Sequence, residues 1–276
     1  MTNVSERQER YVLGHSQSEL RRLRVQAELL DDLTEDVLRR AGIAKGMHVL
    51  DLGSGAGDVA LLAARLVGPT GRVLGVDRAP EAVESAWVRS TPPGGAPVSF
   101  QVADLVDLDL GAQFDLLVGR LVLAYVSDPV AVLRRAVAHL RPGGAVVLQE
   151  IDLSTARSHP RLELYHTCLD WIQETFVRAN LVVDSGMRLH MVFRGAGLPT
   201  PRMISSARAD VGRDAPIYDY IAATVRSLLP TMIRLGVTTE EEAGVDTLAT
   251  RLLAEATEAD ALVIAPAFIS AWARTP

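Results

Sequence analysis

The chain has 276 residues, of which 48% are hydrophobic, 22% charged and 5% aromatic, and its formal net charge is −6. This length suits either one large α/β domain or one domain with an added subdomain. The negative charge gives no indication of a nucleic-acid or anionic-membrane partner. A single cysteine, Cys168, excludes an intrachain disulfide and a multi-cysteine metal site. The first ten residues lack the apolar segment of a secretory signal, and no apolar run could span a bilayer, so we expect a soluble, cytoplasmic protein without membrane partners.

The first predicted element is an N-terminal helix, because apolar residues recur at three- and four-residue steps from Leu20 to Leu38 and Gly42 follows as a C-cap. From Met47 the pattern alternates between strand and helix. Strands are predicted over 47–52, 72–76, 98–102, 114–118 and 145–149, and helices over 59–67, 79–89 and 128–140. This alternation predicts an α/β fold with a doubly wound, mostly parallel, Rossmann-like sheet.

After residue 152 the alternation breaks. Helices are predicted over 162–180, 186–196, 217–235 and 240–257, and strands over 202–209 and 261–273, the last interrupted or bulged at Pro266. These two strands complete a seven-stranded sheet. The helices between them are insertions that form either a lid over the site or extra packing. We therefore expect three consecutive parts: an N-terminal helical segment covering the site (1–44), a Rossmann-like core (45–152), and the rest of the sheet with the lid (153–276).

The most informative segment is D-L-G-S-G-A-G-D, residues 51–58, where a glycine-rich turn joins the first strand to a helix. Glycine adopts positive φ freely and lets a ligand touch the backbone, so this turn is typical of a nucleotide-cofactor site. The dinucleotide fingerprint is G-x-G-x-x-G, but Asp58 takes the place of its third glycine. A carboxylate there competes with a pyrophosphate for the positive end of the helix dipole. Asp51 and Asp58 together favour a cofactor with an ammonium group and no phosphate, such as S-adenosylmethionine (SAM).

Two more acids follow predicted strands. Asp77 ends the second strand, where a carboxylate can accept two hydrogen bonds from a ribose diol, and Asp104 ends the third, where it can accept from an adenine amino group. Each acid alone could equally be a solvated residue or a helix cap. Three acids at the ends of three successive strands, beside the glycine turn, together favour a SAM site.

Four motifs in order, between about Lys45 and Asp152, resemble those of class I SAM-dependent methyltransferases. They are the glycine turn with Asp77, V-A-D at 102–104, F-D-L-L-V at 114–118, and L-R-P-G-G at 140–144. The most similar variety is the small-molecule group that includes the ubiquinone and menaquinone biosynthesis methyltransferases. The segment Y-V-L-G-H-S at 11–16 also resembles an N-terminal element of some bacterial natural-product methyltransferases.

The resemblance implies SAM as the cofactor and a role for each residue around it. Asp51 would shape the turn and add negative potential, and Asp77 would bind the ribose. Arg120, beside the sulfonium, would pair with the methionine carboxylate or with a nearby acid. The implied cofactor-binding residues are Asp51; Gly53, Ser54, Gly55 and Gly57 at the methionine part; Asp77; Arg78, Ala103, Asp104 and Leu105 around the adenine; and Gly119 and Arg120.

Methyl transfer from a sulfonium is an in-line displacement, for which the protein mainly supplies orientation and exclusion of water. A base is needed only for a protonated, weakly acidic acceptor. The candidates are His15, whose pKa range suits a base; Tyr11, lining the transfer channel; and Glu150, contacting substrate at the carboxyl edge of the sheet. The alternatives are a surface or capping histidine at 15 and a structural ion pair at 150. No residue spacing indicates a metal site, and the single cysteine disfavours an arsenic acceptor.

Aromatic and methionine residues after position 152 are candidates for an apolar acceptor pocket, although each alone is more often a core residue. They are Trp171, Phe176, Met187, Met191, Phe193, Tyr218, Tyr220 and Met232. We predict a SAM-dependent methyltransferase acting on a small organic acceptor, and a homodimer is compatible with the sequence. The alternatives are a SAM-binding protein without methyl transfer and an NAD(P)-dependent oxidoreductase, against which Asp58 counts.

Overall fold

The computed structural model describes residues 17–89, 93–213 and 215–276. They form two compact units, each built from several segments of the chain. The unit that we call the sheet unit contains residues 30–150, 185–206 and 269–276. The other, the helical unit, contains residues 151–184 and 207–268 and the described residues before Leu30. This division differs from three consecutive parts, because the chain passes between the units several times.

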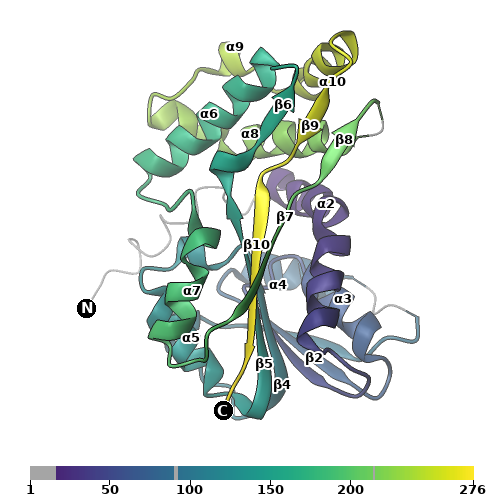
Figure 1. Cartoon of the computed structure of the whole chain (residues 1–276), viewed down its shortest axis with the longest axis vertical. Helices are drawn as coiled ribbons and strands as arrows, with labels where there is room; N and C mark the ends of the chain where they lie inside the picture. Colours follow the sequence, from purple (N-terminus) through teal and green to yellow (C-terminus); the bar gives the residue numbers. More distant parts are fainter. Residues whose placement is uncertain (1–16, 90–92, 214) are drawn as a thin grey trace. The chain divides into compact units, whose positions relative to one another are not determined.

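The sheet unit is built on a seven-stranded sheet with the order β3-β2-β1-β4-β5-β10-β7. Its strands β2, β4, β5, β10 and β7 are labelled in Figure 1. The strands are β1 His48–Leu52, β2 Arg72–Asp77, β3 Val98–Val102, β4 Phe114–Arg120, β5 Leu140–Asp152, β7 Arg202–Ser206 and β10 Ala267–Arg274. The pairings from β3 to β5 are all parallel. The strand order reverses between β1 and β4, and ligands of open α/β sheets bind at such a switch point. The predicted mostly parallel, seven-stranded sheet is confirmed.

Helices flank this sheet where the sequence predicts them. The sheet unit holds α3 Asp58–Val67, α4 Pro80–Trp87, α5 Pro129–Val137, α7 Ser185–Gly195 and the second half of α2 Gln17–Ala41, with the short 3-10 turns η1 Leu105–Asp107 and η2 Leu123–Tyr125. Pro80 and Pro129 occupy the first turns of their helices, where the missing N–H costs nothing. Leu38, Leu62 and Leu116 are fully buried in one core, so α2 and α3 pack on the sheet through apolar residues.

The helical unit has a small sheet of its own, with the order β6-β9-β8 and antiparallel pairings. Its strands are β6 Arg157–His159, β8 Ala209–Val211 and β9 Leu262–Ile264, and its helices are α6 Glu163–Arg178, α8 Ile217–Arg234, α9 Glu240–Ala243 and α10 Leu248–Glu258, preceded by η3 Leu153–Thr155. The fully buried Tyr165 of α6 donates a hydrogen bond to the Ile264 carbonyl at 3.1 Å and joins a helix to this sheet. No described helix combines the length and the apolar composition needed to cross a membrane.

Three elements in the second half of the chain differ from the prediction. The strand predicted over 202–209 is two strands, β7 and β8, which belong to different sheets. The final strand is interrupted at Pro266, as predicted, but its halves β9 and β10 also belong to different sheets. The helix predicted over 240–257 breaks at Gly244, whose φ of 50° is left-handed, so that α9 and α10 are separate.

The residues predicted to line an acceptor pocket are divided between the units. Met187, Met191 and Phe193 lie on α7 of the sheet unit, and the other five lie in the helical unit. Phe193 and Met232 are fully buried, as core residues are, whereas Met187 and Met191 are exposed. The lid over the site therefore stays a prediction.

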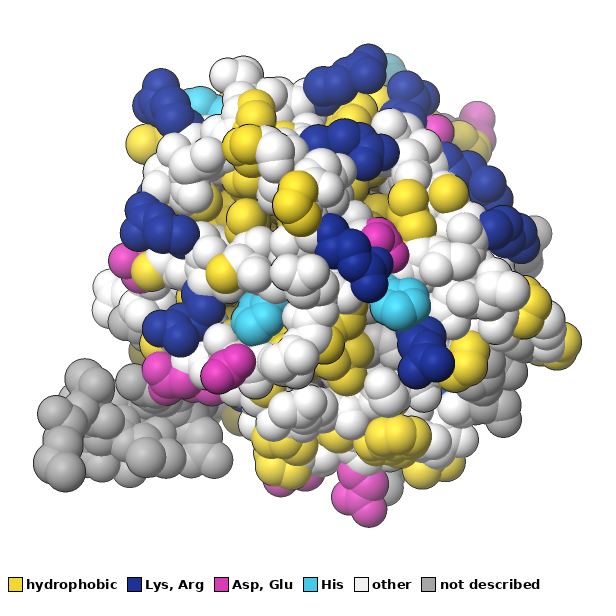
Figure 2. All heavy atoms as spheres, turned by 90° about the horizontal axis from the view of Figure 1, so that it is seen from below, with side chains coloured by type: hydrophobic (Ala, Val, Ile, Leu, Met, Phe, Trp, Pro, Cys, Tyr) yellow, Lys and Arg dark blue, Asp and Glu magenta, His cyan; other side chains and the backbone are white. Residues whose placement is uncertain are grey.

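The charge of the chain is unevenly distributed. Although the net charge is −6, Lys and Arg side chains are spread over the face shown in Figure 2, with few acidic side chains among them. Net charge alone therefore does not describe this face, and the expected absence of a nucleic-acid partner stays a prediction.

Candidate functional site

The glycine turn after β1 has the backbone that the sequence predicts. Gly53, Gly55 and Gly57 have φ values of 61°, 52° and 86°, in the left-handed region that favours glycine. Ser54 N–H donates to the Val76 carbonyl of β2 at 2.9 Å, and Gly57 N–H donates back to the Ser54 carbonyl at 2.8 Å. The turn is thus fixed to the sheet before α3 begins.

Packing inside the protein is a second reason for glycine in this turn. A Cβ atom at Gly53 would lie 2.5 Å from Cγ2 of Val122, and one at Gly57 would lie 2.7 Å from Cζ of Phe100. These distances are too short for any side chain. The sequence interpretation assigned the glycines to positive φ and to ligand approach. It missed the packing of Val122, from the loop after β4, and of Phe100, from β3.

Asp51 and Ser54 each have a buried side-chain oxygen without a hydrogen-bond partner among the described residues. Asp51 is 1% exposed, and the two atoms are its Oδ2 and the Ser54 Oγ. Burial raises the pKa of Asp51 to about 8, although the nearby Arg120 guanidinium acts in the opposite direction. Because buried polar atoms in native proteins are nearly always paired, this pair fits a ligand that donates hydrogen bonds.

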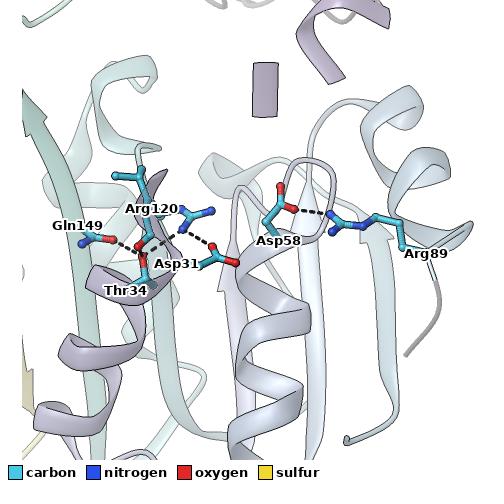
Figure 3. Close-up of polar contacts among 7 residues, drawn as sticks. Asp31, Thr34, Asp58, Arg89, Arg120 and Gln149 are labelled. Carbon is cyan, nitrogen blue, oxygen red and sulfur yellow. Dashed lines mark hydrogen bonds and ion pairs between the residues drawn. The ribbon is translucent and has the colours of Figure 1, made fainter. Parts of the chain in front are cut away.

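Asp58 is not free to act on a cofactor, in contrast to the electrostatic argument from the sequence. Its carboxylate is 8% exposed and pairs with Nη1 of Arg89 at 2.5 Å (Figure 3). The same guanidinium nitrogen donates to the Ala56 carbonyl at 2.8 Å, inside the glycine turn. Asp58 therefore anchors the turn to the end of α4, and its charge is compensated. Of the two acids that flank the turn, Asp51 has no such ion pair within the part of the chain that the structure describes.

Asp77 ends β2, as predicted, and its carboxylate supports the turn. Oδ2 accepts a hydrogen bond from Gly55 N–H and Oδ1 accepts one from Ala79 N–H, both at 2.9 Å. Each carboxylate oxygen can accept a further bond. Asp77 therefore lies beside the glycine turn, where the ribose is predicted to bind.

The predicted adenine-binding residues lie at the ends of β2 and β3. Ala103 N–H donates to the Asp77 carbonyl at 2.9 Å. Asp104 caps η1 by accepting from Val106 N–H at 2.9 Å, and Leu105 is buried in η1. Arg78 follows Asp77 and is half-buried. A helix cap was the alternative predicted for Asp104, and the structure shows this cap. Adenine binding by Asp104 stays a prediction.

Arg120 is held by a network of polar side chains. Its Nη1 donates to Asp31 Oδ1 and to Thr34 Oγ1 of α2, both at 3.1 Å (Figure 3). The Thr34 hydroxyl donates to Gln149 Oε1 at 2.8 Å, and Gln149 Nε2 donates to Ser270 Oγ at 3.2 Å. Of the two partners expected for Arg120, the nearby acid is present and is Asp31. The network joins α2, β4, β5 and β10.

This network was missed in the sequence, although one signal was present. Thr34 is 2% exposed on the apolar face of α2, between Leu30 and Leu38, so a polar residue interrupts a buried stripe. Burial raises the pKa of Asp31 and the Arg120 charge opposes that effect. A buried polar residue on a helix face is a general sign of such a network.

Gly119 precedes Arg120 and leaves little room for a side chain. A Cβ atom there would lie 3.1 Å from both Leu148 Cδ2 and Val122 Cγ1. The end of β4 is therefore closely packed against β5 and against the loop that follows.

Glu150 is fully buried near the end of β5. Its Oε1 accepts from Val122 N–H at 2.9 Å and Leu123 N–H at 2.7 Å, and its Oε2 accepts from Ser185 Oγ at 3.0 Å. The pKa of Glu150 is raised to about 7, because the effect of burial exceeds the opposing effect of these hydrogen bonds. Among the described residues, Glu150 contacts backbone N–H groups and a serine, and none of them forms the ion pair that was the alternative. The other two candidates, Tyr11 and His15, lie outside the described residues and stay predictions.

Comparison with known proteins identifies the family. Residues 43–191 match a family model described as a methyltransferase domain, which covers more than half of the chain. The chain belongs to this family. It is a class I SAM-dependent methyltransferase domain, as its ordered motifs predict, and SAM is its cofactor. The match gives no support to the oxidoreductase alternative.

Individual relatives agree with this assignment. The chain is 31% identical over 184 residues to an uncharacterized 37.1 kDa protein in a transposon of Streptomyces fradiae, covering 66% of this chain and 51% of that protein. It is 40% identical over 114 residues to an arsenite methyltransferase of Aquipseudomonas alcaligenes, covering 38% and 33%. The chain thus spans about half or less of the length of these curated relatives. The crystal structure of the YcgJ protein of Bacillus subtilis shares the fold, with a TM-score of 0.54, 20% identity, and coverage of 87% of this chain and 97% of that one.

Proposed function

We propose that this protein transfers the methyl group of SAM to a small organic acceptor. The observation that carries the proposal is the pair of buried, unpartnered oxygens of Asp51 and Ser54 beside the glycine turn. The ammonium group of SAM donates hydrogen bonds, and SAM has no phosphate that would be repelled by a carboxylate. The residues of the turn therefore fit the methionine part of this cofactor.

The remaining cofactor contacts follow from the edge of the sheet. Asp77 would accept from the ribose hydroxyls with the lone pairs that its two backbone hydrogen bonds leave free. Arg78 and the segment 103–105 would hold the adenine. Arg120, at the end of β4, would bind the methionine carboxylate while Asp31 and Thr34 hold its guanidinium in place. Such charge-assisted pairs orient a ligand as well as bind it.

Bound SAM supplies a methyl group already activated on a sulfonium. The chain would contribute the alignment of donor and acceptor and the exclusion of water. Its candidate base for a protonated acceptor is His15, with Tyr11 lining the path of the methyl group. Glu150 is a weaker candidate than the sequence indicated, because its carboxylate already accepts three hydrogen bonds from the protein.

An organic acceptor is favoured over arsenite, although one relative is an arsenite methyltransferase. Arsenic binding uses thiolates, and the one cysteine of the chain, Cys168, is buried in α6. Burial raises its pKa to about 12, which disfavours a thiolate at neutral pH. The acceptor atom would be O, N, S or C. The homodimer that is compatible with the sequence is also part of this proposal.

The test is binding first and transfer second. SAM and S-adenosylhomocysteine (SAH) should raise the melting temperature, and NAD should not. Asp77→Ala should lose most of that shift, whereas Asp109→Ala, at an exposed aspartate after β3, should keep it. Incubation with SAM and a panel of phenols, amines, thiols and carboxylic acids should then release SAH. Binding of SAM without turnover of any acceptor would favour the alternative of a SAM-binding protein that transfers no methyl group.

A further inference from the structure

The loop after β4 is strained. Leu121 has a φ of 57°, in the left-handed region that non-glycine residues rarely adopt. Such a conformation persists only where the surroundings impose it. Leu121 N–H donates to the Gln149 carbonyl at 2.8 Å, and the next two N–H groups, of Val122 and Leu123, both donate to the Glu150 carboxylate. The end of β5 therefore imposes the conformation of this loop.

The side chain of Val122, in this loop, packs against the glycine turn. Its Cγ2 occupies the space in which a Cβ atom of Gly53 would lie, and its Cγ1 lies against Gly119. Val122 is itself buried. A shift of the loop would therefore move Val122 against or away from the turn that holds the methionine part of SAM in the proposed site.

The other oxygen of Glu150, Oε2, accepts a hydrogen bond from Ser185, where the chain returns to the sheet unit. Glu150 is the last residue of the sheet unit before segment 151–184 of the helical unit, and Ser185 is the first residue after it. The hydrogen bond from Ser185 Oγ to Glu150 Oε2 thus closes the two ends of that segment. Beside it, Gly186 lies so close to Ile269 that its Cβ atom would be 2.6 Å from Ile269 Cγ1. The start of α7 is fixed against the same sheet.

We propose that Glu150 is a positioning residue for the cofactor site. Its buried carboxylate holds the Leu121–Leu123 loop so that Val122 supports the glycine turn, and Ser185 holds the carboxylate in turn. The inference rests on the proposed function, because it assigns the effect to SAM binding. It replaces the earlier expectation that Glu150 contacts substrate.

Two substitutions at Glu150 distinguish an effect on cofactor binding from a general loss of protein stability. In Glu150→Gln the amide oxygen still accepts both loop N–H groups and the amide nitrogen can donate to Ser185. In Glu150→Ala both backbone donors lose their acceptor. The dissociation constant for SAH, measured by titration calorimetry, should rise about tenfold or more in Glu150→Ala and stay within about threefold in Glu150→Gln.

Val146→Ala provides a matched destabilised control. Val146 lies on the same strand and is fully buried, but it has no part in the loop or the turn. It should lower the melting temperature and leave the SAH affinity within about twofold. Wild-type affinity in Glu150→Ala would overturn the inference, as would an equal loss of affinity in Val146→Ala.

Ser185→Ala keeps the inference testable if Glu150→Ala does not fold. It removes one hydrogen bond from the carboxylate and should weaken SAH about threefold or more. An affinity equal to that of the wild type would then overturn the inference. Absence of SAH binding by the wild-type protein is a different outcome, because it would refute the proposed function itself.

Discussion

Arg120 of β4 donates a hydrogen bond to Asp31 of α2 at 3.1 Å, between residues 89 positions apart in sequence. The Arg120 side chain is 4% exposed and the Asp31 side chain 31% exposed, so the pair lies at the edge of the interior. A helix outside the predicted cofactor motifs therefore holds the side chain of Arg120, one of the residues predicted to bind the cofactor. If the proposed site is correct, α2 contributes to it through this contact.

Asp31→Asn should destabilise the protein, because the buried guanidinium would lose its ionised partner. The loss should be about 1–2 kcal/mol, between the values for exposed and buried pairs, since Asp31 is partly exposed. Glu35→Gln is the control on the same helix, because Glu35 is as exposed as Asp31 but its partner Arg39 is 62% exposed, against 4% for Arg120. The Glu35–Arg39 pair should contribute less than about 0.5 kcal/mol. Denaturant unfolding measures both. Equal losses in the two variants would show that Asp31 acts as an ordinary surface pair.

The sheet could be predicted from the sequence because its signals are local. Each strand from β1 to β5 contains apolar residues close together in the sequence, and the turns between them have a glycine, proline or capping residue within a few positions. Two of the three elements that were mistaken depend on distant partners instead, and the third breaks at a local glycine, Gly244. Nothing near Pro266 in the sequence indicates that β9 joins a small sheet with β6 and β8, while β10 enters the large sheet. Strands of three residues are also too short to show a periodicity.

The candidate site shows the same limit. The glycine turn and the acids that follow it could be read directly, because a motif of consecutive residues specifies them. The pairing of Asp58 with Arg89, 31 positions away, and the packing of Val122 on Gly53 depend on the folded sheet. The sequence therefore predicts the residues of a cofactor site, and the folded structure shows that the charge of Asp58 is already compensated by Arg89.

The stability of the protein should depend on the ionisation of Asp51. Its pKa is raised from 3.8 to about 8 by burial, so the folded state binds more protons than the unfolded state between these values. The contribution of Asp51 to the free energy of unfolding therefore decreases as the pH rises from about 4 to 8. Asp51→Asn removes this titration. The stability of the variant relative to the wild type should rise over that range by an amount on the order of a few kcal/mol. Denaturant unfolding at several pH values measures it, and a constant difference would contradict the assignment.

SAM binding should release a proton from Asp51 near pH 7. A carboxyl group with a pKa of about 8 is mostly protonated there, and an ammonium group nearby favours its ionised form. The SAM affinity should therefore increase from pH 6 to pH 8. Calorimetric titrations in buffers of different ionisation enthalpy measure the proton release directly. Asp51→Asn should abolish the part due to this residue, and the same proton release in the variant would assign it to another group.

Gly53→Ala should lower the free energy of unfolding more than the same substitution at another glycine with a similar backbone conformation. Gly111 is the matched control, because its φ of 58° is close to the 61° of Gly53 and a Cβ atom there meets nothing within 4 Å. Gly111→Ala should cost about 1 kcal/mol from the left-handed backbone alone. Gly53→Ala should cost about 1–3 kcal/mol more, because its methyl group overlaps Val122. Adding Val122→Ala should recover part of that excess in the free energy of unfolding. If the two alanine variants were equally stable, packing by Val122 would not be a reason for glycine at position 53.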